Sequence, residues 1–264
     1  MKPLIERIWG LEDQGRISFA KGQQSRMHYC STVAQTYYDI VEALHEPDTD
    51  ESALTLYMNL PRLISGIIDY GLQTHDHVLQ HKEHIETMAT KAFQGNYDAA
   101  LRRCSWLLLP QKAHTSPVVE KPDLITWRAN KPAYIDNLCA RLHGRHVDIL
   151  VIDGHDGYRP GLAVASALDV PIFSVHNSVG SNFEHTPELL RDEHYLMEQV
   201  LHNKHVWIFG EDISTGGAVM SLQRLVQYHS KPKSIHTASC IWMPPSEHLP
   251  KGRPDCYGIR KIAY

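Results

Sequence analysis

The chain has 264 residues, of which 42% are hydrophobic and 21% charged, and a formal net charge of −4. These values are typical of globular proteins; they exclude a strongly basic nucleic-acid-binding surface, and five scattered cysteines exclude a disulfide-rich scaffold. Because the sequence has neither an apolar run of about 18 residues nor the apolar core of a signal peptide, we expect a cytoplasmic protein with reduced thiols and no membrane partner.

The first part of the sequence has the periodicity of α-helices. Apolar or aromatic residues recur at helical spacing at Val33, Tyr37, Ile40, Val41 and Leu44, and the turn-rich residues 46–51 follow. Further helices are expected at about 51–72, 75–93 and 96–109. Residues 110–122 contain three prolines and are typical of a connector. We therefore predict a helical region over residues 1–111 and a second domain over residues 112–264.

Three histidines in the helical region have the spacing of metal ligands. His77, His81 and His84 are placed at i, i+4 and i+7, which puts them on one face of the predicted helix. A metal site would also need a carboxylate from another element. The chain contains 18 histidines, so a polar face turned to solvent or to another subunit is the expected alternative.

The second half of the sequence alternates between strand and helix signals. Pro132 begins a helix whose apolar residues would pack on the strand at 147–152. Gly154 and Gly157 then interrupt the chain, a second helix begins near Pro160, and residues 169–171 lead to a strand at 172–175. This order predicts a βαβ unit and an α/β domain in which helices flank a parallel sheet.

Residues 206–218 carry the most informative motif. The apolar strand 206–209 is followed by Gly210, the acidic pair Glu211 and Asp212, and a small-residue loop that leads into a helix at 218–228. Backbone N–H groups at the start of a helix favour a phosphate. Carboxylates can accept hydrogen bonds from sugar hydroxyls. The combination indicates a site for a phosphorylated sugar.

This motif resembles the phosphoribosyl pyrophosphate (PRPP) motif of the type I phosphoribosyltransferases. The order of the segments after it, with Ala238-Ser239 and then Pro254-Asp255-Cys256-Tyr257-Gly258, is similar to the hypoxanthine-guanine branch of that family. The loop after residue 152 is similar to the family's pyrophosphate loop in shape more than in sequence. The resemblance covers about the last half of the chain, and it implies a type I phosphoribosyltransferase-like fold there.

The resemblance implies a role for each residue of the motif. Glu211, Asp212 and Thr215 stand at the family's catalytic positions, and the two acids would hold the ribose hydroxyls. The PRPP phosphate groups would contact Ser214, Thr215, Gly216, Gly217, Ala218 and Val219 in one loop and His155, Asp156 and Gly157 in the other. Mg²⁺ is the implied cofactor and would neutralise the pyrophosphate, but no protein ligand to the metal is assigned.

Several residues depart from the family pattern. Thr215 stands where the hypoxanthine-guanine branch has an aspartate, and a hydroxyl cannot act as a base near neutral pH. Met243 stands where that branch has a purine-reading lysine, and a thioether cannot donate to a carbonyl oxygen. His176 and Asn177 replace an Arg-Lys pair that contacts pyrophosphate. A 6-oxopurine acceptor is therefore not expected.

The acceptor position is surrounded by aromatic and sulfur-containing residues, namely Trp242, Met243, Cys256 and Tyr257. Trp242 and Tyr257 could stack on a planar acceptor, or Trp242 could simply pack as a strand residue. Residues 178–202 lie where the family carries a mobile loop that closes over the site. Residues 188–200 in this stretch have a helical pattern, so it could instead form a dimer contact.

Two functions follow from the resemblance. The first is an active phosphoribosyltransferase, a glycosyltransferase of nucleotide metabolism, that binds PRPP and an unknown small-molecule acceptor and forms a homodimer. The second is a non-catalytic sensor that binds PRPP or a nucleotide with the same fold. Retention of both acids favours the enzyme, and the substituted pyrophosphate contacts favour the sensor.

Overall fold

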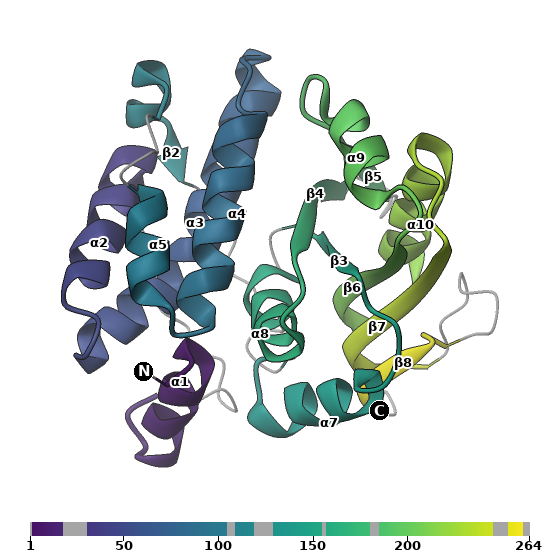
Figure 1. Ribbon diagram of the computed structural model, residues 1–264, viewed down its shortest axis with the longest axis horizontal. Helices are drawn as coiled ribbons and strands as arrows, with labels where there is room; N and C mark the ends of the chain where they lie inside the picture. Colours follow the sequence, from purple (N-terminus) through teal and green to yellow (C-terminus); the bar gives the residue numbers. More distant parts are fainter. Residues whose placement is uncertain are drawn as a thin grey trace. The chain divides into compact units, whose positions relative to one another are not determined.

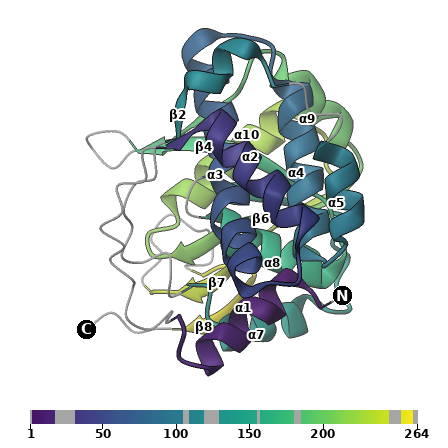
Figure 2. The ribbon, with the colours of Figure 1, turned by 90° about the vertical axis from the view of Figure 1, so that its left-hand side faces the viewer.

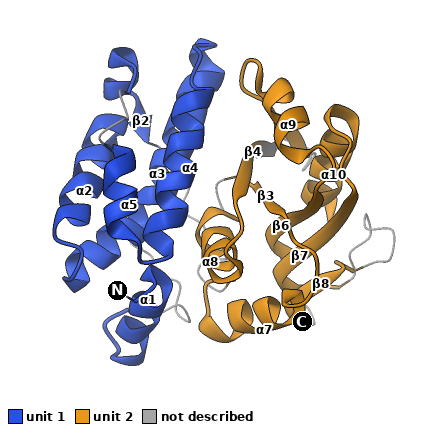
Figure 3. Ribbon diagram, viewed as in Figure 1, with its two compact units in different colours: residues 1–127 blue, residues 128–264 orange. Residues whose placement is uncertain are grey.

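The computed structural model describes residues 2–17, 31–104, 109–118, 129–154, 157–179, 185–244 and 253–260 (Figure 1). The chain divides into two compact units, residues 1–127 and 128–264 (Figure 3). The sequence suggested a boundary between residues 111 and 112. The structure has it later, because strand β2 (Pro117–Val118) pairs antiparallel with β1 (Ser31–Thr32) of the first unit.

The first unit is helical in its described part, as the sequence indicated. Thr32 and Thr49 cap two of its helices, since their side-chain oxygens accept hydrogen bonds from the backbone N–H groups of Gln35 and Ser52 at 3.2 and 3.1 Å. The helices are α1 (Leu4–Asp13), α2 (Val33–His45), α3 (Asp50–Thr74), α4 (Leu79–Phe93), α5 (Tyr97–Cys104) and the short 3₁₀ helix η1 (Gln111–Thr115). Helix α1 was not expected from the sequence, although Leu4, Ile5, Ile8 and Leu11 form its buried face.

The predicted helix over 75–93 begins later than expected. His75 takes the left-handed conformation, with φ of 57°, and ends α3, so that α4 begins only at Leu79. His77 therefore precedes the helix, and the predicted three-histidine helix face does not form. Within the part of the chain that the structure describes, no three His, Cys, Asp or Glu side chains are arranged to hold a metal ion.

The second unit contains a six-stranded, mainly parallel sheet (Figures 1 and 2). Its spatial order is β5–β4–β3–β6–β7–β8, in which only β5 runs antiparallel to its neighbour. The strands are β3 (Ile149–Asp153), β4 (Ile172–Val179), β5 (His185–Glu188), β6 (His205–Ile213), β7 (Ser234–Trp242) and β8 (Cys256–Arg260). The strand order reverses between β3 and β6. In open α/β sheets, ligands bind at such a point, beyond the carboxyl ends of the strands.

Helices cover both faces of this sheet. On one face, α9 (Glu193–Leu201) and α10 (Gly217–His229) bury a cluster that includes Val151, Val175 and Ile208. On the other face lie α7 (Pro132–Leu142) and α8 (Tyr158–Leu168). The predicted fold class is confirmed: an α/β domain with a mainly parallel sheet flanked by helices, preceded by a helical region. No helix among the described residues combines the length and hydrophobicity needed to cross a membrane.

Two packing details differ from the sequence expectations. Helix α7 packs mainly on β8 and β7 rather than on the strand that follows it. Gly258 permits this, because a Cβ at that position would clash with the backbone oxygen of Tyr134. Strand β4 is also longer than expected and pairs with β5. Residues 178–202, which were predicted to lie where the family has a mobile loop that closes over the site, therefore contain a strand and helix α9 in their described part.

Candidate functional site

Glu211 and Asp212 lie within strand β6, not in a loop after it. The predicted strand ended at residue 209, but β6 continues to Ile213 because Asp212 and Ile213 pair with Ile241 and Trp242 of β7. The acidic pair therefore lies at the carboxyl end of the strand, directly before the turn that leads to α10.

The two acids also differ in their access to solvent. Glu211 is 8% exposed, whereas Asp212 is partly exposed at the carboxyl end of β6. Glu211 lies near the fully buried thiol of Cys240: burial raises the pKa of that thiol well above its usual range, and the charges of Cys139 and Glu211 add to the effect. Asp212 is thus the acid that can reach a ligand directly.

The turn after β6 has the geometry of an anion site. Ser214 and Thr215 are exposed, and Gly216 has φ of 83°, a conformation that glycine adopts without strain. Helix α10 starts at Gly217, whose backbone N–H donates to Thr215 Oγ1 at 3.3 Å. The N–H groups of the first helical turn have no acceptor within the helix, so Ala218 and Val219 can direct theirs towards a phosphate.

Gly210 sets the position of this turn. A Cβ at Gly210 would lie 3.1 Å from Val219 Cγ2 and 3.6 Å from Ile213 Cγ1. A larger residue at this position would require the Val219 side chain to shift by a few tenths of an ångström. Gly210 therefore favours close packing of the first turn of α10 on β6.

The loop between β3 and α8 lies beside this turn at the same edge of the sheet. The loop contains two closely packed glycines: a Cβ at Gly154 would lie 2.8 Å from the Val175 oxygen, and one at Gly157 3.1 Å from Ile152 Cγ2. The predicted ligands His155 and Asp156 lie outside the described residues. Gly157 is the N-cap of α8.

The predicted acceptor residues form an aromatic and cationic cluster. The ring centroids of Trp242 and Tyr257 are 4.9 Å apart, and the Arg260 guanidinium carbon lies 4.9 Å from the Trp242 centroid. Arg141 of α7 lies 4.8 Å from the Tyr257 centroid. Because Trp242 is only 8% exposed, the geometry favours its role as a packed strand residue over stacking on an acceptor.

The other two predicted acceptor residues, Met243 and Cys256, contribute to the structure of the domain. The Met243 backbone N–H donates to the Ile213 oxygen at 2.8 Å and holds the chain after β7 against β6. Cys256 is buried, and burial raises the pKa of its thiol. Desolvation also raises the pKa of Cys139 to about 12. These thiols are therefore protonated near neutral pH and are not nucleophiles.

The side chain of Arg260, which was not among the predicted site residues, also lies at this edge of the sheet. Arg260 ends β8, is exposed, and pairs in register with Trp242. The sequence could have indicated Arg260, because it ends the strand that contains Cys256 and Gly258. The last residue of such a strand lies at the carboxyl edge of a parallel sheet. The family pattern has its acceptor-reading cation at position 243, so the motif alone did not indicate residue 260.

Comparisons with known proteins give structural similarities only. No family model and no curated protein matches the chain. A purine phosphoribosyltransferase from Pyrococcus horikoshii Ot3 is 18% identical, with a TM-score of 0.42, over 52% of this chain and 87% of that one. A hypothetical protein from Neisseria gonorrhoeae with bound ppGpp is 18% identical, with a TM-score of 0.39, over 50% and 78%.

A xanthine-guanine-hypoxanthine phosphoribosyltransferase from Helicobacter pylori is 11% identical, with a TM-score of 0.35, over 44% of this chain and 74% of that one. Two of these three structures are phosphoribosyltransferases, the family that the sequence motifs resemble. Similarity at this level does not establish an activity. The fold assignment rests on the strand order and helix placement of this chain itself.

Proposed function

We propose that the protein is a phosphoribosyltransferase that uses PRPP and Mg²⁺, transfers the phosphoribosyl group to an acceptor other than a 6-oxopurine, and releases pyrophosphate. One observation carries the proposal: the partly exposed Asp212 closely precedes a positive-φ glycine turn and a helix start at the carboxyl edge of a parallel sheet. A carboxylate for sugar hydroxyls and N–H donors for a phosphate are thereby combined at one place.

The chain's own residues would act by positioning and electrostatics. Asp212 would accept a hydrogen bond from a ribose hydroxyl, and the N–H groups of Ala218 and Val219 would hold the 5′-phosphate. The β3–α8 loop, which includes Gly157, would face the pyrophosphate. Departure of pyrophosphate leaves positive charge on the ribose, and nearby carboxylates stabilise that charge without a covalent intermediate.

We propose that carboxylates at this edge of the sheet contribute ligands to the magnesium ion. Asp153 ends β3, and Ile152 pairs in register with Phe209 of β6, so Asp153 and Asp212 belong to neighbouring strands at one edge of the sheet. Magnesium commonly takes one or two carboxylates together with substrate phosphate oxygens. Bound there, the ion would neutralise charge on the leaving pyrophosphate.

Titration calorimetry with PRPP and MgCl₂ tests the proposed binding site. We expect Asp212→Asn, which keeps the shape of the side chain, to weaken PRPP binding by about 1.5–3 kcal/mol through loss of a charged acceptor. Asp136→Asn is the matched control, because Asp136 is an exposed aspartate on α7 of the same unit. Equal affinity in wild type and Asp212→Asn would exclude Asp212 from the site.

Steady-state assays test the acceptor. With Thr215 and Met243 in place of a base and a cation, we expect no appreciable turnover of hypoxanthine or guanine. The exposed guanidinium of Arg260 instead favours an acceptor with a negative charge, such as a carboxylate. Activity with a carboxylate acceptor that falls in Arg260→Gln would support this assignment, and robust wild-type activity with either purine would overturn it.

A sensor that binds PRPP or a nucleotide without turnover is the second candidate. The observation that favours it is the burial of Glu211, which is 8% exposed and therefore offers a ligand less access than Asp212 does. For a sensor, PRPP would bind with the same dependence on Asp212, but neither transfer to an acceptor nor slow hydrolysis of PRPP would be detected.

A further inference from the structure

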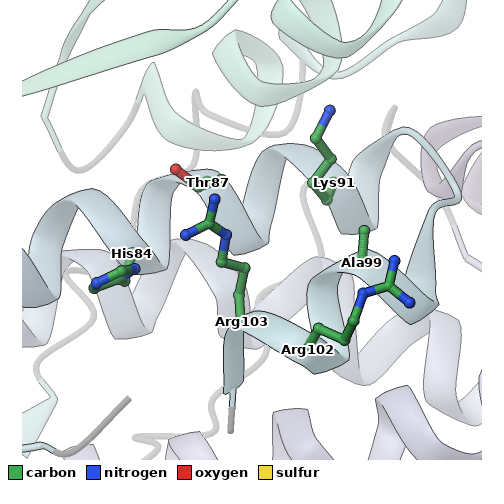
Figure 4. Close-up of a pocket in the computed structure, with 6 residues that line it drawn as sticks. All are labelled: His84, Thr87, Lys91, Ala99, Arg102 and Arg103. Carbon is green, nitrogen blue, oxygen red and sulfur yellow. The ribbon is translucent and has the colours of Figure 1, made fainter. Parts of the chain in front are cut away.

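Helices α4 and α5 of the first unit border an open hollow of about 480 Å³ whose lining includes three permanently charged cations (Figure 4). Its six lining residues are His84, Thr87 and Lys91 of α4 and Ala99, Arg102 and Arg103 of α5. Ligand pockets commonly measure about 300–1,000 Å³. The hollow is therefore much larger than a single inorganic ion requires.

The cations converge on the hollow because two helices bring them together. His84, Thr87 and Lys91 recur at i, i+3 and i+7 and so share one face of α4. The α4–α5 turn is short, and Gly95, with φ of 76°, reverses the chain between the helices. Arg102 and Arg103 of the last turn of α5 then lie on the same hollow, and the Arg103 guanidinium points towards Thr87 (Figure 4).

A favourable interaction with the helix dipole explains only part of this arrangement. Lys91 lies in the last turn of α4, and both arginines lie in the last turn of α5, where positive charge is favourable. That effect does not require the three cations to line one cavity, where they repel each other. None of the described lining residues is a carboxylate, although Arg102 has a contact of its own.

The polar contacts of the lining leave donors for a ligand. Lys91 Nζ donates to Gln94 Oε1 at 3.0 Å, which uses one of its three N–H groups. Thr87 Oγ1 donates to the Glu83 backbone oxygen at 2.8 Å, so the threonine presents its methyl group and an acceptor. Together with Ala99, it gives the hollow an apolar wall between cationic ends. Arginine side chains bind phosphate oxygens in pairs, which suits a phosphate better than a simple carboxylate.

We propose that this hollow binds a small organic phosphate with at least two phosphate groups, of the nucleoside diphosphate class, at a site separate from the β6–α10 turn. The phosphate groups would contact Arg103 and Lys91, and the organic part would rest on Ala99 and Thr87. The inference does not depend on the proposed transferase activity, because every lining residue belongs to the first unit.

Calorimetric titration of the full-length protein with ADP, tripolyphosphate and inorganic phosphate tests the site. We expect ADP to bind more tightly than inorganic phosphate, and Arg103→Gln to weaken ADP binding at least about tenfold. Lys112→Gln is the matched control, since Lys112 is an exposed cation of η1 that does not line the hollow. Gly216→Val, which alters the β6–α10 turn, should leave this ADP site intact.

Each other outcome counts against the site. ADP binding that is lost in Gly216→Val but kept in Arg103→Gln would place the ligand at the β6–α10 turn and overturn the inference. If Arg103→Gln and Lys112→Gln weakened ADP binding equally, the binding would be non-specific attraction between opposite charges. Tighter binding of a 20-nucleotide RNA than of ADP, lost in Arg103→Gln, would replace the small ligand by a nucleic acid. Native circular dichroism of Arg103→Gln is the folding control.

Discussion

The two strand-to-helix connections at the carboxyl edge of the sheet use glycine for different reasons. In the β3–α8 connection, Gly154 is required because backbone atoms of Val175 and His176 occupy the space of a side chain. In the β6–α10 connection, Gly216 is required because the backbone takes φ of 83°. The first connection is fixed by packing and the second by a local turn. The same residue type thus supports the structure at one connection and shapes the candidate phosphate site at the other.

Substitution at Gly154 should have the largest effect on stability. A Cβ at this position would lie 2.8 Å from the Val175 backbone oxygen, which also accepts a hydrogen bond from the Gly154 N–H at 2.8 Å. Backbone cannot move aside as a flexible side chain can, so we expect Gly154→Ala to lower the free energy of unfolding by about 3 kcal/mol. Urea denaturation followed by circular dichroism measures it.

Gly10→Ala provides the control for this substitution. Gly10 lies inside helix α1, and no heavy atom lies within 4 Å of the position that an alanine Cβ would take, so alanine should be neutral or stabilising there by up to about 1 kcal/mol. If Gly154→Ala and Gly10→Ala unfold at the same urea concentration, close packing is not what fixes the β3–α8 connection.

Substitution at Gly216 should have a smaller effect on stability and a specific effect on binding. Alanine at a positive φ costs about 1–2 kcal/mol, and a changed turn would redirect the N–H groups at the start of α10. Gly15→Ala is the matched variant, because Gly15 has φ of 71° and open space around it. We expect similar destabilisation in both variants, measured by urea denaturation, but loss of PRPP binding only in Gly216→Ala. Similar PRPP affinities in the two variants would locate the phosphate elsewhere.

The buried thiol of Cys240 in β7 should make stability depend on pH at alkaline values. Burial raises the pKa of Cys240 in the folded state, while the unfolded thiol ionises at about 8.5. Its stabilising contribution is therefore complete below about pH 8.5 and is lost as the pH rises towards the folded-state pKa. The slope for this thiol is at most about 1.4 kcal/mol per pH unit.

Urea midpoints measured between about pH 8 and 10 test this dependence. Cys240→Ala removes the thiol and should reduce the alkaline slope, although it lowers stability at every pH by leaving a small cavity. Ser221→Ala is the control, because Ser221 is a partly exposed residue of α10 whose hydroxyl does not titrate in this range. An unchanged slope in Cys240→Ala would show that the space beside Glu211 admits water.

The sequence predicted the type of most elements but not their ends. Helical periodicity identified α2 and α3, and apolar runs identified β3, β4 and β6, because burial of one face or of a whole strand leaves a local pattern. The predicted end of β6 was wrong, since carboxylates such as those at 211 and 212 are typical of loops. Their strand conformation depends on pairing with β7, a contact distant in sequence.

The candidate site was predictable where local backbone chemistry decides it. The glycine pair at 216–217 correctly marked the turn, because a positive φ and a helix start both have sequence signals. The different exposure of Glu211 and Asp212 depends on how far β6 extends, and the contact of Arg260 with the ring of Trp242 depends on strand register. The convergence of Arg102 and Arg103 with Lys91 requires the antiparallel arrangement of α4 and α5. None of these appears in a single segment.

Phosphorus NMR of the wild-type protein with PRPP, Mg²⁺ and a panel of anionic and aromatic acceptors tests the central claim most directly. The account predicts acceptor-dependent release of pyrophosphate, reduced at least about tenfold in Asp212→Asn and unchanged in Asp136→Asn. A wild-type protein that binds PRPP but releases no pyrophosphate, either with an acceptor or slowly to water, would contradict the transferase and leave the sensor.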